Sequence, residues 1–143
     1  STPIANRTVT FDASNSTPGW NGTHHPPIVN YTWDFGNGNT TKVTKPEIEH
    51  TYSQAGNYTV TLTVTDAANQ TGTISYIIEV LDLNKYDTNG DGVIDLKDVF
   101  RVALAYGSYP GHEAWDPVCD FNNDDTVDLK DYFAVALHYG EEL

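Results

Sequence analysis

The sequence predicts an all-β sandwich over residues 1–82, followed by a small all-α module made of two loop–helix repeats. Three observations predict this class. Residues 58–65 alternate threonine with an apolar or aromatic residue, which is the period of a half-buried strand. Beyond residue 82 the apolar residues recur at helical spacing instead. An acidic twelve-residue pattern that opens at Asp87 opens again at Asp120.

The strands of the first module are marked by their period and by the turns between them. Residues 8–11 and 58–65 alternate in polarity, and residues 74–80 form a more continuously apolar stretch. Turn signals separate them as clusters of Pro, Gly and Asn at residues 17–19, 25–27, 36–39 and 55–57. Several short strands at such spacing predict an antiparallel sandwich.

Three segments of the first module carry a family pattern: Trp33 to Gly38, His50 to Tyr52 and Gly56 to Asp66. Together with Val9 to Ser14, they make residues 3–80 similar to a PKD (polycystic kidney disease) domain. The resemblance implies an immunoglobulin-like sandwich with Trp33 in its core, and a role as a spacer or binding module. Asn37 departs from the family pattern, which usually has Asp there.

Three aspartates of the first module have two interpretations. Asp34 is expected to cap a turn or a strand end. A weak metal site shared by Asp12, Asp34 and Asp66 is left open, because nothing in their spacing requires it.

Composition and charge argue against several functions. A net charge of −13 opposes binding to nucleic acid or to an anionic membrane surface. No apolar run approaches the length of a transmembrane helix. The single cysteine, Cys119, cannot form an internal disulfide and is expected to be a small, partly buried thiol. The sequence shows no nucleophile with a base, no phosphate loop and no glycosidase-like pair of carboxylates, so it predicts a protein that is not an enzyme.

Asn-x-Ser/Thr sequons are confined to the first module. They occur at Asn6, Asn15, Asn21, Asn30, Asn39, Asn57 and Asn69. Glycans need surface positions in exported proteins, although a strand module rich in Asn and Thr also produces sequons by chance. The pattern predicts an extracellular or cell-surface location and a candidate glycoprotein. The chain begins at Ser1 and contains no Met, so we expect it to be a piece of a longer polypeptide.

Both acidic patterns place oxygen donors where a calcium loop needs them. Side-chain oxygens or a main-chain carbonyl fall at loop positions 1, 3, 5, 7, 9 and 12, which is the EF-hand ligand schedule with Asp in place of the final Glu. We therefore predict two structural Ca²⁺ ions. Their predicted ligands are Asp87, Asn89, Asp91, Val93, Asp95, Asp98, Asp120, Asn122, Asp124, Thr126, Asp128 and Asp131.

The duplication continues into the segments after the loops. Ten of the thirteen residue pairs between 95–107 and 128–140 are identical, and Gly107 and Gly140 are expected to end the two helices. The repeats differ at loop position 6, which is Gly92 in one and Asp125 in the other. A left-handed turn costs more at Asp than at Gly, so the second site is expected to be weaker or stiffer.

The paired loop–helix units, Asp at position 12 and Asp116-Pro117 before the second loop make residues 84–141 similar to a dockerin domain. The resemblance implies a pseudo-twofold pair of helices, two calcium ions and docking to a cohesin module of another protein. In that family loop positions 10 and 11 and nearby helix residues meet the cohesin. The predicted contacts here are Leu96, Lys97, Phe100, Arg101, Leu104, Leu129, Lys130, Phe133 and Leu137. Leu and Lys replace the small hydroxyl residues frequent in cellulosomal dockerins, which leaves the type of partner open.

The apolar residues of the first repeat helix sweep an arc of about 200° on a helical wheel, more than a two-helix module can bury. The sequence thus predicts a non-catalytic docking module over residues 83–143, with residues 1–82 as a spacer. The short connection from Leu81 to Lys85 predicts that the two pack together. The alternative is a calcium-stabilised structural segment of a cell-surface protein without a cohesin partner. Self-association is possible but not predicted.

Overall fold

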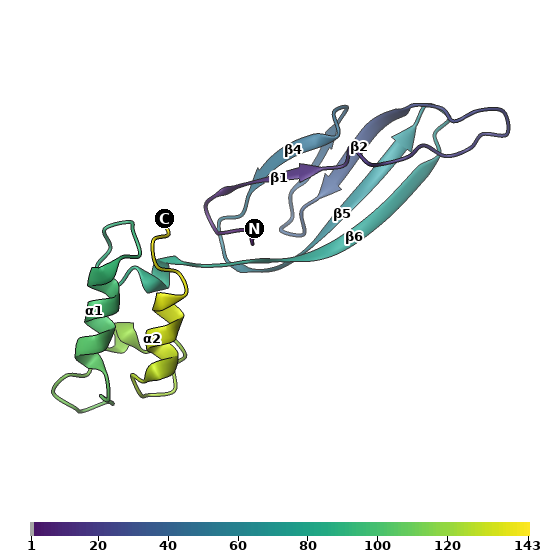
Figure 1. The fold of residues 1–143 in the computed structure, drawn as a ribbon. Helices are drawn as coiled ribbons and strands as arrows, with labels where there is room; N and C mark the ends of the chain where they lie inside the picture. Colours follow the sequence, from purple (N-terminus) through teal and green to yellow (C-terminus); the bar gives the residue numbers. More distant parts are fainter. Residues whose placement is uncertain (1) are drawn as a thin grey trace. The chain divides into compact units, whose positions relative to one another are not determined.

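The computed structural model describes residues 2–143, which divide into two compact units (Figure 1). The first unit ends at Leu81, and its regular elements are all strands. The second runs from Asp82 to Leu143 and contains helices and loops, apart from one isolated bridge between Val93 and Glu142. Among the residues described, no helix has the length and apolarity needed to cross a membrane.

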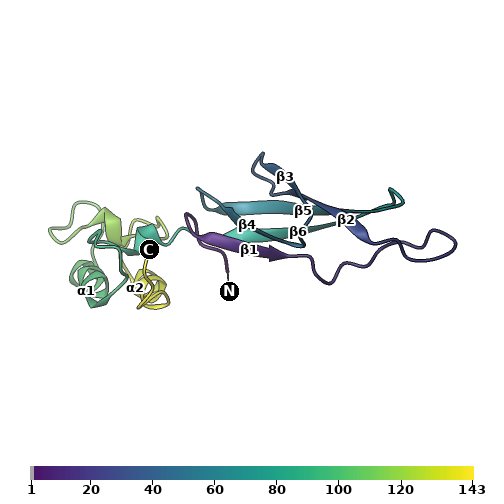
Figure 2. The ribbon, with the colours of Figure 1, turned by 90° about the horizontal axis from the view of Figure 1, so that it is seen from above.

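The first unit is a β-sandwich of two antiparallel sheets, as predicted (Figures 1 and 2). Its strands are β1 Thr8–Asp12, β2 Ile28–Asp34, β3 Thr40–Val43, β4 Glu47–Thr51, β5 Gly56–Asp66 and β6 Thr71–Val80. One sheet pairs β1 with β4, and the other has the order β3-β2-β5-β6. The chain therefore crosses between the sheets after β1, before β4 and after β4, which is a Greek-key connection.

The apolar and threonine side chains that alternate along β5 face the core and the solvent, respectively. Val60 and Leu62 face the buried side and belong to the core between the sheets. The threonines face outward and pair across to β6, where the Thr61 and Ser75 hydroxyl oxygens lie 2.8 Å apart and those of Thr63 and Thr73 lie 3.1 Å apart. Cross-strand hydroxyl pairs of this kind stabilise a sheet face that water can reach.

Aromatic side chains fill the centre of the sandwich. Trp33 is buried, as predicted, and lies with Phe35 and Tyr52 in one apolar cluster. The Tyr52 hydroxyl donates to the Phe35 carbonyl at 3.0 Å, and burial raises the pKa of Tyr52 to about 12. The Tyr58 hydroxyl donates to the Gln54 carbonyl at 2.8 Å at the start of β5. A tyrosine bonding back to the main chain at this point is the tyrosine corner of immunoglobulin-like folds.

The structure differs from the sequence-based expectation in two strands and in the exposure of one sheet edge. The alternation of polarity did not indicate β3 or β4, because each is short and mostly exposed. The apolar stretch at residues 74–80 does form a strand, but β6 is the outermost strand of its sheet. Its Tyr76 and Ile77 side chains are 65% and 73% exposed, so the apolar run there does not mark burial.

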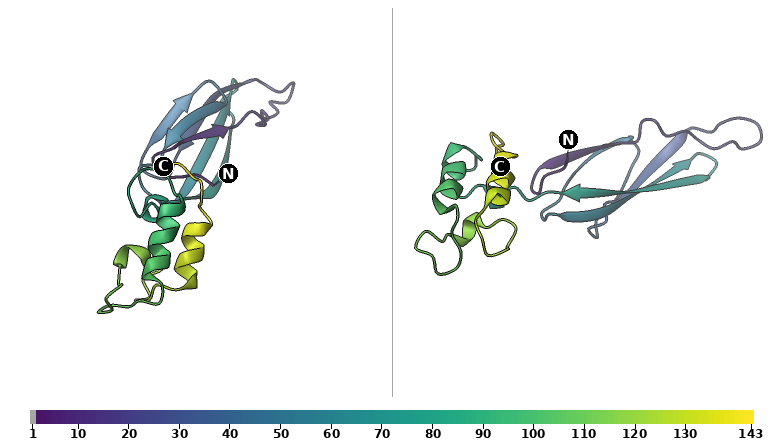
Figure 3. Two further views of the ribbon diagram at one scale, coloured as in Figure 1. Left: turned by 60° about the vertical axis from the view of Figure 1, so that its left-hand side comes forward. Right: turned by 60° about the horizontal axis from the view of Figure 1, so that its bottom comes forward.

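The second unit is built around two short helices that lie side by side (Figure 3). Its elements are η1 Asn84–Tyr86, α1 Leu96–Ala105, η2 Pro117–Cys119 and α2 Leu129–Ala136. Its core includes four apolar side chains that water does not reach, two from the helices and two from the loops: Ile94, Val102, Val127 and Val135. Gly107 follows the C-cap of α1 with a φ of 79°, which confirms its predicted role.

The apolar spacing continues beyond both helices, but the helices do not. Tyr106 is the C-cap of α1 and Tyr139 lies in the turn after α2, and both are exposed. Apolar spacing therefore does not fix where either helix ends. Gly107 directly follows the C-cap of α1, but α2 already ends at Ala136, so Gly140 lies in the turn beyond it and does not end the helix as expected.

Candidate functional site

Each acidic loop lies between a single 3₁₀ turn and an α-helix. The first follows η1 and leads into α1, and the second follows η2 and leads into α2. The sequence duplication is thus repeated in the backbone. In the described residues only the short turn η1, and no full helix, directly precedes the first loop.

Loop positions 4 and 6 adopt the same left-handed conformation in both repeats. The φ angles are 74° at Gly90 and 88° at Gly92 in the first loop, against 57° at Asn123 and 62° at Asp125 in the second. Two such residues so close together turn the chain sharply around the carboxylate at position 1. Asp125 confirms that the second loop accepts a left-handed residue with a side chain at position 6, at some energetic cost.

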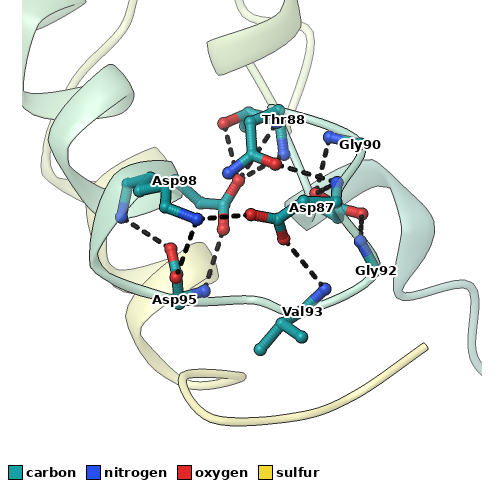
Figure 4. A network of polar contacts seen from close by, with 10 residues as sticks. Asp87, Thr88, Gly90, Gly92, Val93, Asp95 and Asp98 are labelled. Atoms are coloured by element: carbon teal, nitrogen blue, oxygen red, sulfur yellow. Dashed lines mark hydrogen bonds and ion pairs between the residues drawn. The ribbon is translucent and has the colours of Figure 1, made fainter.

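The aspartate at position 1 organises its loop through backbone amides (Figure 4). Asp87 accepts from the N–H groups of Gly90 at 2.7 Å, Asp91 at 3.2 Å and Gly92 at 2.9 Å. Asp120 accepts in the same way from the N–H groups of positions 5 and 6, at 3.2 and 3.0 Å. Both loops therefore wrap around an anionic centre.

The aspartate at position 12 joins the start of its loop to the start of its helix. Asp98 is fully buried, accepts from the N–H of Asp95 at 2.8 Å, and accepts from the N–H and hydroxyl of Thr88 at 2.8 and 3.0 Å. Asp95 in turn accepts from the N–H of Lys97 at 2.8 Å and from the N–H of Asp98, and the latter contact completes a capping box. Asp131 is equally buried in a second capping box.

These buried carboxylates place negative charge where a nearby positive charge would stabilise it. The hydrogen-bond donors to Asp98 are uncharged amide and hydroxyl groups. Burying a carboxylate without an opposite charge is costly, and a nearby cation offsets that cost. The excess of negative charge is concentrated in the second unit, because residues 82–143 hold fourteen of the twenty acidic side chains and four of the seven lysines and arginines.

A lysine at position 11 supplies part of the positive charge. The Nζ of Lys97 lies 2.6 Å from Asp91, and the Nζ of Lys130 lies 2.8 Å from Asp124. Each hydrogen bond holds the pKa of its aspartate below the ordinary value and raises the pKa of its lysine. The lysine side chains are about two-thirds exposed, so solvent weakens both pairs.

The donor chemistry of the loops fits a hard cation. Across residues 2–143 no three His, Cys, Asp or Glu side chains are gathered in the arrangement of a metal site. The predicted ligand set, however, also includes the Asn89 and Asn122 amides and the main-chain carbonyls of Val93 and Thr126. A donor set made entirely of oxygen suits Ca²⁺ rather than zinc. The contacts seen tie the predicted ligands to one another, as when Asn89 accepts from the N–H of Asp91 at 2.8 Å.

Backbone hydrogen bonds join the two repeats. The N–H of Gly107, after α1, donates to the carbonyl of Val127 in the second loop at 2.8 Å. The N–H of Gly140, after α2, donates to the carbonyl of Ile94 in the first loop at 2.7 Å. The backbone after each helix therefore supports the loop of the other repeat.

The helices expose a matching apolar stripe. On α1, Leu96, Phe100 and Leu104 are 56%, 60% and 75% exposed, whereas Val102 and Ala105 face the core. In the second repeat the corresponding side chains are Leu129 and Phe133 on α2 and Leu137 at its C-cap, at 54%, 58% and 80%. All six apolar side chains predicted as partner contacts thus lie at the surface, three in each repeat.

Arg101 differs from the other predicted contact residues. Its Nε lies 2.7 Å from Asp116, and its guanidinium also donates to the carbonyl of Thr88. The hydrogen bond to Asp116 raises the pKa of Arg101. This side chain therefore links the first loop to the approach of the second. The sequence did not reveal this role, because the equivalent residue in the other repeat is Ala134.

Residues 2–80 match the family model of the PKD domain. The chain belongs to the PKD domain family.

The structure shows the role of the three aspartates of this PKD domain for which sequence spacing left two interpretations. Asp12 accepts from the N–H of Ser14 at 2.7 Å, Asp34 from that of Gly36 at 2.9 Å, and Asp66 from that of Ala68 at 2.9 Å. Each caps its own turn, as predicted for Asp34.

Similar proteins match mainly the PKD domain. A microbial collagenase of Vibrio alginolyticus is 40% identical over 80 residues, which cover 56% of this chain and 9% of the collagenase. A solved structure from work on carbohydrate-binding modules of the β-sandwich superfamily is 33% identical, with a TM-score of 0.51, and the match covers 57% of this chain and 31% of that one. The matches thus span only a small part of those longer chains.

One similar structure extends beyond the PKD domain. A chain of a type II cohesin-X-dockerin complex from Acetivibrio cellulolyticus is 22% identical, with a TM-score of 0.37, and the match covers 94% of this chain and 96% of that one. A TM-score this low supports no statement about function. The interpretation of the second unit therefore rests on its own residues.

Proposed function

We propose that residues 82–143 form a calcium-dependent docking module of the dockerin type, which binds a cohesin on a scaffold or cell-surface protein. The observation that carries this proposal is the matching apolar stripe on α1 and α2. Three large apolar side chains on one short helix are costly to expose to water, and the duplication exposes the same three again. Partner binding would bury them.

Two structural calcium ions are part of the proposal. Support comes from the left-handed turns at positions 4 and 6, the buried aspartates at position 12 and the oxygen-only donors in both loops. When bound, calcium would supply positive charge and loop rigidity. Asp87, Asn89, Asp91, Val93, Asp95 and Asp98 would hold one ion, and the matching residues from Asp120 to Asp131 would hold the other.

The proposed role is non-catalytic, with the PKD domain as a spacer. Asp12 and Asp34 cap turns in the first unit, and Asp95 and Asp128 cap helices in the second. We also propose an extracellular or cell-surface location. Six of the seven sequon asparagines are exposed and Asn30 is half-buried, so most acceptor sites are open to a glycosyltransferase.

A panel of cohesin modules titrated against the whole chain tests the function. We expect tight binding to at least one cohesin in calcium and its loss in excess chelator. A variant with Leu96, Phe100, Leu129 and Phe133 changed to Ala should lose binding in calcium while still taking up two equivalents of the ion. Changing the exposed pair Tyr109 and Val118 to Ala is the matched control and should leave affinity unchanged.

The outcomes separate the docking role from its alternative. Calcium uptake without binding to any cohesin would leave a calcium-stabilised structural segment as the function. Binding that persists in excess chelator would contradict the calcium-dependent mechanism. Binding that survives the four changes would place the docking surface elsewhere.

A further inference from the structure

A second surface of the chain lies at the free edge of its larger sheet. β6 is the last strand in the order β3-β2-β5-β6 and runs for ten residues, Thr71–Val80 (Figure 1). Ile74, Tyr76 and Ile77 are all largely exposed on it. A long edge strand presents unpaired N–H and C=O groups, and these form a template for another strand.

The other outer strands carry features that oppose pairing. β3 has only four residues, among them Lys42, and β4 has five, among them Glu47 and Glu49. β1 also has only five residues. Short length and charged side chains are the usual protection of sheet edges. β6 is twice as long as β1 or β4, and its one charged residue is Glu79, near its end.

The backbone shows which part of β6 is free. The N–H of Leu81 donates to the carbonyl of Pro3 at 2.9 Å, and the N–H of Ala5 donates to the carbonyl of Leu81 at 2.8 Å. The N-terminal segment thus covers the edge at Leu81. The pairing of β6 with β5 is regular from Val80 to Thr71. Because backbone groups alternate in direction, every second residue back from Leu81 also points outward, which leaves residues 71–79 available.

The side chains define what an added strand must carry. Ile74, Tyr76 and Ile78 lie on the inner side of β6, where they line an open apolar cleft together with Phe11 and Leu62. A strand placed beside β6 would cover this cleft only if every second side chain were apolar. β6 has this pattern itself, with Thr73 and Ser75 on its outer face.

We propose that β6 pairs antiparallel with β6 of a second copy of this chain. Pairing that uses all of residues 71–79 places Ser75 on the twofold axis. Ile74 then lies opposite Tyr76 of the second copy, an aromatic–aliphatic cross-strand pair of the stabilising kind. Glu79 lies opposite Thr71 of the second copy, so no like charges meet. The interface is the same patch used twice, as twofold symmetry requires.

The pair joins two four-stranded sheets into one continuous sheet and ends the exposure of both edges. It also gives each assembly two copies of the second unit. Two tethered docking modules bind a partner that carries several receptors more tightly than one does, through effective concentration. The dimer itself does not depend on the docking role proposed above.

Sedimentation equilibrium of the whole chain over a wide concentration range tests the pairing. We expect a monomer–dimer equilibrium. Ser75→Lys puts two like charges on the axis and should raise the dimer dissociation constant at least about tenfold. Thr41→Lys adds the same charge to exposed β3 at the far edge of the sheet, and should leave the constant unchanged. A monomer at every concentration, or equal behaviour of the two variants, would overturn the proposal.

Disulfide trapping gives a second measurement that does not depend on a destabilising change. Ser75→Cys should form a covalent dimer on mild oxidation, because hydrogen-bonded partners across antiparallel strands have Cα atoms about 5.5 Å apart. Thr61→Cys is the matched control, since Thr61 lies opposite Ser75 on β5, one strand further from the axis in each copy. The native Cys119 is buried and does not interfere. Failure of Ser75→Cys to cross-link, or equal cross-linking of both variants, would contradict the pairing.

Discussion

At the scale of single residues, loop position 6 separates the two repeats. Gly92 has a φ of 88° and Asp125 a φ of 62°, so the same turn is made with and without a Cβ. Gly92→Asp should weaken calcium binding to the first loop by about 1 kcal/mol, because a left-handed residue with a side chain costs more than glycine. Asp125→Gly should strengthen the second loop or leave it unchanged. Calorimetric titration of both variants checks the two directions, and a tighter first loop in Gly92→Asp would refute the argument.

The first aspartate of each loop is expected to be required for one ion only. Asp87 and Asp120 each hold the N–H groups of their own loop, and no hydrogen bond links the two. Asp87→Ala and Asp120→Ala should therefore each remove about one equivalent of calcium in a calorimetric titration. Glu113→Ala makes the same charge change at an exposed residue outside both loops, and should retain both equivalents. Unchanged stoichiometry in the aspartate variants would show that these loops are not the calcium sites.

At the scale of elements, η2 carries a reporter of loop order. Cys119 is buried in this turn, and burial raises the pKa of its thiol to about 11, so little thiolate exists near neutral pH. We expect slow reaction of Cys119 with an aromatic disulfide reagent in calcium, and reaction at least about tenfold faster in excess chelator, since calcium binding is coupled to folding. Equal labelling rates in the two conditions would show that the turn keeps its order without the ion.

At the scale of the whole molecule, the two units should respond differently to calcium removal. The PKD domain has a core of its own, whereas the second unit has a small core and buried carboxylates. Excess chelator should abolish the helical far-ultraviolet circular dichroism and the amide protection of α1 and α2. The amides of β2 and β5 should stay protected from hydrogen exchange. Helicity that chelator leaves unchanged would contradict calcium-coupled folding.

The duplicated stripe predicts redundancy in docking. Leu96→Ala with Lys97→Ala damages one face, and a partner can use the other after a turn of about 180°, so affinity should fall by no more than about twofold. Adding Leu129→Ala and Lys130→Ala should cost far more, because buried anchors carry about 1 kcal/mol or more each. Titration of one cohesin against each variant measures this non-additivity. Loss of all binding after the first pair of changes, with calcium uptake intact, would show that the two faces are not equivalent.

The sequence by itself determined the features that depend on local chemistry. Period-two threonines, the turn-capping Asp34 and the glycine after α1 act over a few residues, so spacing alone located them. The twelve predicted calcium ligands were also chosen from their spacing along each loop, and they remain a prediction. The hydrogen bond between Gly140 and Ile94 could not be predicted from the sequence, since it joins residues far apart along the chain.

Only the tertiary structure decided which apolar residues stay exposed. Val102 and Leu104 have similar polarity and lie two residues apart, yet one is buried and the other is 75% exposed, because α2 packs on one side of α1 alone. Ile77 is exposed because β6 is the last strand of its sheet, and strand order is set by long-range pairing. Arg101 was expected at a partner interface but pairs with Asp116 within the chain. Burial depends on what packs opposite a residue, and the local sequence does not contain that information.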